Sequence, residues 1–209
     1  MIKRTAFKHG WWYHYCLHNK KSDKLITNGF SLLQNYLISM FDKCPHEYFE
    51  NGPRSSKLKF QLPSLNIKEH NNHPICDLTQ HGLEINEERY KSNHMKVQMF
   101  LLENDKKTVS IEVPVWLKTK EFGSFKTHFD SEYPLTGHID LLQIDKDKIW
   151  VWDYKPGASK EKYASTQTYF YALMLSNRTK IPLDKFRCGW FDSCNCYTFK
   201  PELKNLNDF

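Results

Sequence analysis

The chain has 209 residues, which suffices for one domain with a substantial core or one domain with an appendage. It contains no apolar run of about 18 residues, and its first residues lack the apolar stretch of a signal peptide, so neither a membrane span nor secretion is indicated. We therefore expect a cytoplasmic protein without a membrane partner. The net charge of +6 permits an anionic partner such as nucleic acid but does not require one.

Residues 1–24 are rich in aromatic side chains, histidine and lysine, and they include the neighbouring Trp11 and Trp12. Such a segment is either an arm that stacks on nucleic-acid bases or a strand or helix that packs on the body of the protein. Neighbouring exposed tryptophans are unusual on a soluble monomer, so we favour packing.

Residues 31–49 predict a helix that is broken near Cys44-Pro45. Its apolar residues recur with a period of about 3.6, at Leu32, Leu33, Tyr36, Leu37, Met40 and Phe41. Residues 51–82 contain several prolines and glycines and much asparagine and histidine. We expect a loop with short extended pieces there.

Residues 86–103 predict a second helix, capped by Asn86 and with two glutamates in its first turn. His94 lies on or beside the inward face of this helix. A lone histidine at such a position is either a core residue with a hydrogen-bond partner or a ligand.

Residues 109–117 predict a strand, followed by a polar loop over 118–136. Alternation places Glu112 on the face opposite the valines and isoleucine at Val109, Ile111, Val113 and Val115. Pro114 indicates an edge strand or a bulge.

Residues 137–155 predict two strands joined by a polar turn at 145–148. A symmetric turn has its centre between Lys146 and Asp147, which places Asp140 opposite Asp153. Two facing carboxylates repel, so such a pair raises one pKa or recruits a cation. One interpretation is a divalent metal held by both aspartates with Lys155 beside it; the other is an ordinary hairpin whose aspartates point to water.

Residues 159–178 predict a third helix, and residues 186–199 predict a second strand-turn-strand unit. One stripe of the helix carries Tyr163, Gln167, Tyr171 and Met174. Gln167 is the polar member of this stripe, and a buried amide needs partners.

From residue 86 onward the expected order of elements is α-β-β-β-α-β, which resembles the core of the P-D-(D/E)-X-K nuclease superfamily. Three segments are similar to motifs of its RecB-type branch: Gly137-His138-Ile139-Asp140 to G-x-x-D, Asp153-Tyr154-Lys155 to D-x-K, and Gln167-Thr168-Tyr169-Phe170-Tyr171 to Q-x-x-x-Y. The resemblance implies an α/β (α+β) chain with a restriction-endonuclease-like core at 86–209. A helical and irregular appendage would occupy residues 1–85.

The resemblance also implies a metal-dependent phosphodiesterase that acts on DNA. Asp140 and Asp153 would bind Mg²⁺ or Mn²⁺, with the carbonyl of Tyr154 as a further ligand. Lys155 would position or help deprotonate the attacking water and stabilise charge on the phosphate. Gln167 and Tyr171 would support the site or contact the nucleic-acid backbone. A further ligand comes from His94 or Glu112, or from both, whereas His138 points away from Asp140.

Some relatives hold an iron–sulfur cluster with four cysteines, one before the core and three after it. The cysteines in comparable places here are Cys16 or Cys44 and then Cys188, Cys194 and Cys196. Their spacing lacks the C-x-x-C pair of those relatives, so we do not expect a cluster.

The function that follows is a RecB-like exonuclease acting on single-stranded DNA or on free ends, in repair, recombination or mobile-element processing. A structure-specific endonuclease or resolvase is the alternative within the class. A non-catalytic nucleic-acid-binding module with the same fold is the alternative outside it. The intact Asp140, Asp153 and Lys155 favour catalysis, and the sequence predicts neither protein partners nor oligomeric state.

Overall fold

The computed structural model describes residues 1–27 and 29–206. In this part of the chain one eight-stranded sheet has the order β1-β2-β4-β5-β6-β7-β8-β3. Its strands are β1 Ile2–His9, β2 Trp11–His18, β3 Lys68–His70, β4 Thr108–Leu117, β5 Leu135–Asp145, β6 Lys148–Tyr154, β7 Phe186–Phe191 and β8 Cys196–Phe199. The helices are α1 Asn19–Leu25, α2 Ser31–Lys43, α3 Pro74–Ile85, α4 Asn93–Asn104, α5 Phe125–Phe129 and α6 Ala164–Thr179.

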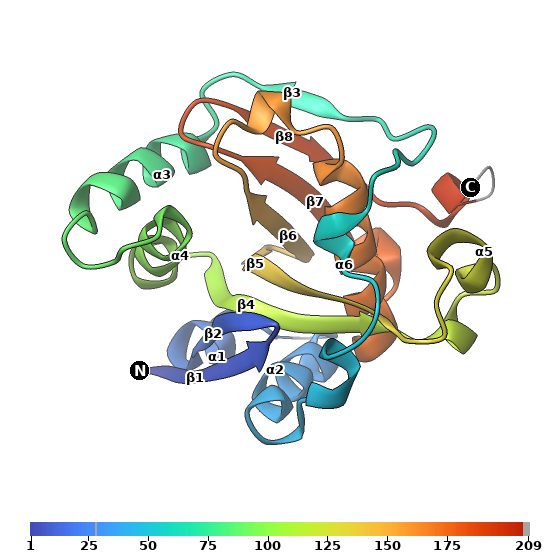
Figure 1. The fold of residues 1–209 in the computed structure, drawn as a ribbon. Coiled ribbons are helices and arrows are strands. Elements are labelled where there is room, and N and C mark those ends of the chain that lie inside the picture. Colours follow the sequence, from blue (N-terminus) through green and yellow to red (C-terminus); the bar gives the residue numbers. More distant parts are fainter. Residues whose placement is uncertain (28, 207–209) are drawn as a thin grey trace.

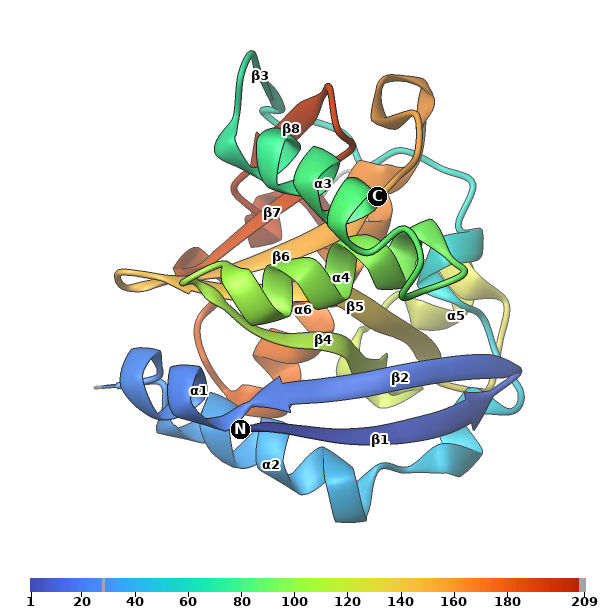
Figure 2. The ribbon, with the colours of Figure 1, turned by 90° about the vertical axis from the view of Figure 1, so that its left-hand side faces the viewer.

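Helices cover both faces of the sheet. Helices α3 and α4 lie against one face, and α6 lies against the other (Figure 1). The quarter-turn view places α4 in front of the central strands and the β1–β2 hairpin along one side of the molecule (Figure 2). The result is a three-layer α/β arrangement with the predicted order of core elements, α4-β4-β5-β6-α6-β7, interrupted by the short α5.

The central hairpin has the register that its turn predicted. Strands β5 and β6 are antiparallel and pair Leu141 with Trp152 and Asp145 with Lys148. Strands β6 and β7 are parallel, and α6 makes the crossover between them. Parallel neighbours require such a crossover, which explains why a long helix follows the hairpin directly.

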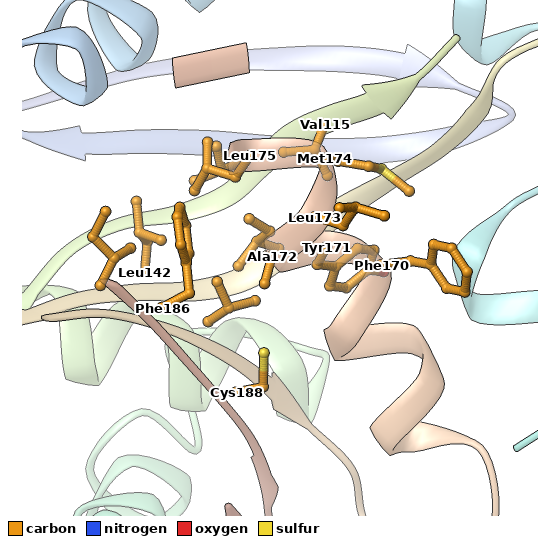
Figure 3. Packing of buried hydrophobic residues seen from close by; sticks show 14 of the residues in the cluster. Val115, Leu142, Phe170, Tyr171, Ala172, Leu173, Met174, Leu175, Phe186 and Cys188 are labelled. Carbon is orange, nitrogen blue, oxygen red and sulfur yellow. The ribbon is translucent and has the colours of Figure 1, made fainter. Parts of the chain in front are cut away.

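The core consists of two clusters separated by the sheet. The first lies between the sheet and helices α2 and α6, and the second between the sheet and helices α3 and α4. Figure 3 shows Ala172 and Met174 of α6 gathered with Leu142 and Phe186 from the strands. Helix α6 is buried from Ala164 through Leu175, so it lacks the polar outer face of a surface helix.

Several helix predictions need correction. Helix α2 ends at residue 43 rather than 49, and α6 begins at residue 164 rather than 159. The predicted loop over 51–82 contains the start of α3, where the His73 side chain accepts a hydrogen bond from the Ile75 N–H and Pro74 occupies the first helical position. Helix α4 begins at residue 93 rather than 86, because Ser92 caps it by accepting from the Met95 N–H. Asn86 instead ends α3.

Strand β4 also differs from its prediction, because its faces do not alternate regularly. Ile111 packs in the second cluster, whereas Val109 and Val113 pack in the first. Two irregularities interrupt the alternation: the pairing of β4 with β5 shifts between Thr108 and Ser110, and Glu112 has a left-handed φ of 51°. The bulge expected near Pro114 therefore lies earlier, at Thr108–Ser110, and the register with β5 is constant from Ser110 to Leu117.

Strands from residues 1–85 belong to the same sheet as the strands of the expected core, since β1, β2 and β3 form its two ends. The division of the chain at residue 85 stays a prediction. Among the described residues no helix combines the length and apolar character needed to cross a membrane.

Candidate active site

Three acidic side chains lie in a row across neighbouring strands. The pairing of Ile111 with Leu141 and of Val113 with Ile139 places Glu112 of β4 opposite Asp140 of β5. The next register position after Leu141 and Trp152 places Asp140 opposite Asp153 of β6. We call Glu112, Asp140 and Asp153 the carboxylate row.

The carboxylate row is almost entirely buried, with exposed fractions of 9%, 8% and 1% for Glu112, Asp140 and Asp153. Burial raises the pKa of Glu112 to about 7, and Asp153 adds to the effect. Burial, followed by the charges of Asp153 and Glu112, holds the pKa of Asp140 well above its usual range. Without a cation these acids therefore resist simultaneous ionisation.

Lys155 and Gln167 hold Asp153 from two sides. The Lys155 Nζ atom lies 2.8 Å from Asp153 Oδ2. The Gln167 Nε2 atom donates to Asp153 Oδ1 at 3.0 Å and to the Tyr171 hydroxyl at 2.8 Å. Burial disfavours charge on Lys155, but Asp153 and Asp140 outweigh it and raise the pKa of the ammonium group. The lysine therefore stays charged beside the row.

Asp140 has two further neighbours. The Tyr154 N–H donates to Asp140 Oδ2 at 2.9 Å, and His94 Nε2 lies 3.8 Å from the same oxygen. Burial lowers the pKa of His94, which favours the neutral imidazole that binds metals. The participation of the Tyr154 carbonyl remains a prediction.

Glu112 is the most unusual member of the row. Its left-handed φ is strained for a residue other than glycine, which indicates a functional constraint at this position. The Gln98 Nε2 atom donates to Glu112 Oε1 at 2.7 Å, while Oε2 is buried without a hydrogen-bond partner. Sequence reasoning missed Gln98, although its spacing four residues after His94 places both on one face of a helix.

The donors of the row fit a hard divalent cation. Carboxylate oxygens are the preferred ligands of Mg²⁺ and Mn²⁺, and the free Glu112 Oε2 supplies an unused lone pair. Among the described residues the row does not form a set of three whose ligand atoms all lie within 4.8 Å of one another. A cation bound by all three acids therefore requires a side-chain rotation that draws the row together.

The row opens into a cavity of about 410 Å³ that is also lined by the beginning of β2 in the β1–β2 hairpin. The segment 1–24 packs on the body as expected, because β1 and β2 are strands of the sheet. Trp11 and Trp12 nevertheless line this cavity and are 75% and 55% exposed, so the argument that they would not be exposed was wrong. Other hairpin residues, Tyr15 and Leu17, make the buried contacts instead. Arg54 lines the cavity as well, and the sequence did not predict it.

His138 lines the same cavity, but it is held on the side of the β1–β2 hairpin. Its ring stacks on Tyr13 at a centroid distance of 3.7 Å, and its Nε2 atom lies 2.9 Å from His9 Nδ1. The neighbouring Asp140 points toward His94 and the Tyr154 N–H instead.

Comparison with known families identifies a match over most of the sheet. The sequence model of the PD-(D/E)XK nuclease superfamily matches residues 69–204, which include all three members of the carboxylate row. A search of curated proteins found no significant match. The matched span begins within β3 and ends after β8, so it covers the sheet from β4 to β8 together with helices α3, α4 and α6.

Proposed function

The chain belongs to the PD-(D/E)XK nuclease superfamily, and from this premise we propose that it is a RecB-type deoxyribonuclease that cleaves single-stranded DNA or DNA with free ends. The observation that supports this proposal most is the buried carboxylate row with Lys155 beside it. Such an activity would serve DNA repair, recombination or mobile-element processing.

The proposal assigns Mg²⁺ or Mn²⁺ to Asp140 and Asp153, with Glu112, His94 and the Tyr154 carbonyl as the further ligand candidates. Both Glu112 and His94 line the cavity beside Asp140. A divalent ion held by these residues would polarise phosphoryl oxygens and would lower the pKa of a bound water.

The remaining side chains would orient the attacking water and the metal ligands and stabilise charge on the phosphate. Lys155 would orient the attacking water and stabilise negative charge on the phosphate, since its ammonium group lies against Asp153 in a buried site. Gln167 would keep the Asp153 carboxylate in one orientation through its hydrogen bond to Oδ1. Tyr171 accepts the second hydrogen bond of the same amide and so fixes Gln167.

The proposed preference for unpaired bases is argued from the residues at the rim of the cavity. Trp11 and Trp12 present apolar rings to solvent beside the carboxylates, and unpaired bases stack on such rings. Arg54 adds a positive charge to the same rim. A duplex offers no free base faces for this stacking except at its ends.

A panel of internally labelled substrates tests the proposal. Linear single-stranded DNA, circular single-stranded DNA, blunt duplex DNA and single-stranded RNA are incubated with Mg²⁺, Mn²⁺ or EDTA. We expect cleavage of the linear single strand with metal, none in EDTA, and resistance of the circle. Cleavage of the circle would instead support an endonuclease, and binding without cleavage would support a non-catalytic module.

A further inference from the structure

A second group of potential metal ligands lies away from the carboxylate row. The ligand atoms of His9, Cys44 and His46 all lie within 4.8 Å of one another. His9 ends β1, Cys44 follows α2, and His46 begins the short 3-10 helix His46–Phe49. His9 and Cys44 are buried, and His46 is exposed. Three separate elements therefore place two imidazoles and a thiol at one point.

The orientation of His9 suits a ligand. Its ring stacks on Phe49 at a centroid distance of 4.0 Å with 11° between the planes, which fixes the direction of both nitrogens. Its Nε2 atom lies 2.9 Å from His46 Nδ1, and its Nδ1 atom lies 2.9 Å from His138 Nε2. A histidine that binds metal through one nitrogen usually has a hydrogen-bond partner at the other, which His138 provides.

We propose that His9, Cys44 and His46 bind one Zn²⁺-type cation that is separate from the ion of the carboxylate row. Two imidazole nitrogens and one thiolate form the borderline-soft donor set of zinc sites, whereas Mg²⁺ takes oxygen ligands. Tetrahedral ligands of zinc lie about 3.3–3.7 Å apart, so small side-chain movements suffice from the present separations. The exposed side of His46 leaves the fourth position to water.

Such an ion would tie the hairpin to the corner after α2. His9 directly precedes Gly10, which has a φ of 76°, and Gly10 precedes Trp11. A metal bond at His9 therefore fixes the turn that presents the tryptophans to the cavity. The Cys44 thiol loses its proton to solvent on binding, because the thiolate is the ligand.

Binding also changes the hydrogen bonds that lead to Arg54. Burial lowers the pKa of His9 to about 4 and that of His138 well below its usual range, so both rings are neutral. Arg54 Nη2 lies 3.2 Å from His138 Nδ1 and can only donate, so His138 Nδ1 accepts and the proton of this ring is on Nε2. His138 Nε2 therefore donates to His9 Nδ1, and His9 in turn donates from Nε2 to His46 Nδ1. A cation on His9 Nε2 leaves the proton of this ring on Nδ1. His9 then donates the hydrogen bond to His138 Nε2 and no longer accepts it. Arg54 then keeps its hydrogen bonds to the Tyr13 hydroxyl and the His9 carbonyl.

Titration of the metal-free full chain with Co²⁺ tests the proposal without any need for nuclease activity. We expect the visible bands of a tetrahedral ion together with a thiolate-to-cobalt charge-transfer band, both removed by competing Zn²⁺. Replacement Cys44→Ser should abolish the charge-transfer band, and His46→Ala should weaken binding at least about 100-fold. His46 is exposed, so its replacement is compatible with folding.

Two control variants locate the band. Cys194→Ser removes an exposed free thiol elsewhere and should leave the spectrum unchanged. Asp153→Asn alters the carboxylate row and should also leave the thiolate band in place. Absence of the band in the wild type, or its persistence in Cys44→Ser, would overturn the proposal.

Discussion

The ring of Tyr171 occupies the space that a side chain at position 137 would need. A Cβ atom built on Gly137 would lie 2.2 Å from Tyr171 Cε1 and 3.0 Å from Cδ1. Tyr171 in turn accepts a hydrogen bond from Gln167, which donates to Asp153. Gly137 therefore leaves room for the Tyr171 ring of α6. Tyr171 and Gln167 of this helix can then hold the Asp153 carboxylate.

This contact predicts that Gly137→Ala lowers the free energy of unfolding by about 1–3 kcal/mol, because the added methyl group overpacks a buried site. Urea denaturation measures the change. Gly123→Ala is the matched control, since a Cβ atom there meets nothing within 4 Å. Equal destabilisation by both substitutions would contradict the packing argument.

The pKa of Glu112 predicts how the stability of the metal-free protein depends on pH. The folded state raises this pKa from 4.5 to about 7, so the stabilising contribution is complete below pH 4.5 and is lost as the pH rises through 7. The free energy of unfolding of the wild type, taken relative to that of Glu112→Gln, should therefore fall by up to about 3 kcal/mol as the pH rises over that range. Urea denaturation in EDTA at several pH values measures it.

Added Mn²⁺ is the control for this dependence. A cation on the carboxylate row would compensate the charge of the ionised Glu112. Added Mn²⁺ should therefore raise the free energy of unfolding of the wild type above pH 7, and it should raise that of Glu112→Gln less. A free-energy difference that does not change with pH would show that Glu112 ionises freely in the folded state.

The hairpin and its register were predictable because they depend on local signals. The polar turn between Lys146 and Asp147 fixes which residues face each other, and the alternation along both strands fixes the face of Asp140 and Asp153. The helix with Gln167 and Tyr171 was predictable from its stripe. Local patterns in the sequence therefore suffice to indicate the centre of the candidate site.

The surroundings of the site were less predictable because they depend on long-range contacts. The left-handed Glu112 interrupts a strand whose composition is that of a regular strand, and no local signal marks it. The start of α3 was missed although His73 and Pro74 form an ordinary helix beginning. Trp11 and Trp12 are exposed because Tyr15 and Leu17 supply the buried contacts of the hairpin, which only the tertiary structure decides.

Lys155 and Asp153 are predicted to be energetically coupled. Lys155→Met leaves the Asp153 carboxylate buried without its cation and should cost about 3 kcal/mol of stability in EDTA. Asp153→Asn combined with Lys155→Met should recover most of that loss, because neither charge remains. A double-mutant cycle from urea denaturation gives the coupling, and simple additivity would refute it.

The exposed tryptophans predict a selective loss of single-strand binding. Replacing both Trp11 and Trp12 by alanine should weaken binding of a labelled single strand by roughly 10- to 100-fold, with a smaller effect on a blunt duplex. Fluorescence anisotropy in EDTA measures binding without cleavage. Tyr133→Ala removes an aromatic ring that is 55% exposed elsewhere and is expected to change neither affinity. Equal losses for single strand and duplex would argue against stacking.

The central claim is that the carboxylate row supports metal-dependent cleavage of DNA. Its most direct test is the cleavage rate of an end-labelled single strand in Mn²⁺ by wild type and by Asp140→Asn, with circular dichroism to verify that both are folded. We predict cleavage by the wild type that EDTA abolishes, and a rate lowered at least about 100-fold in the variant. Wild-type cleavage in EDTA, or an undiminished rate in Asp140→Asn, would contradict the claim.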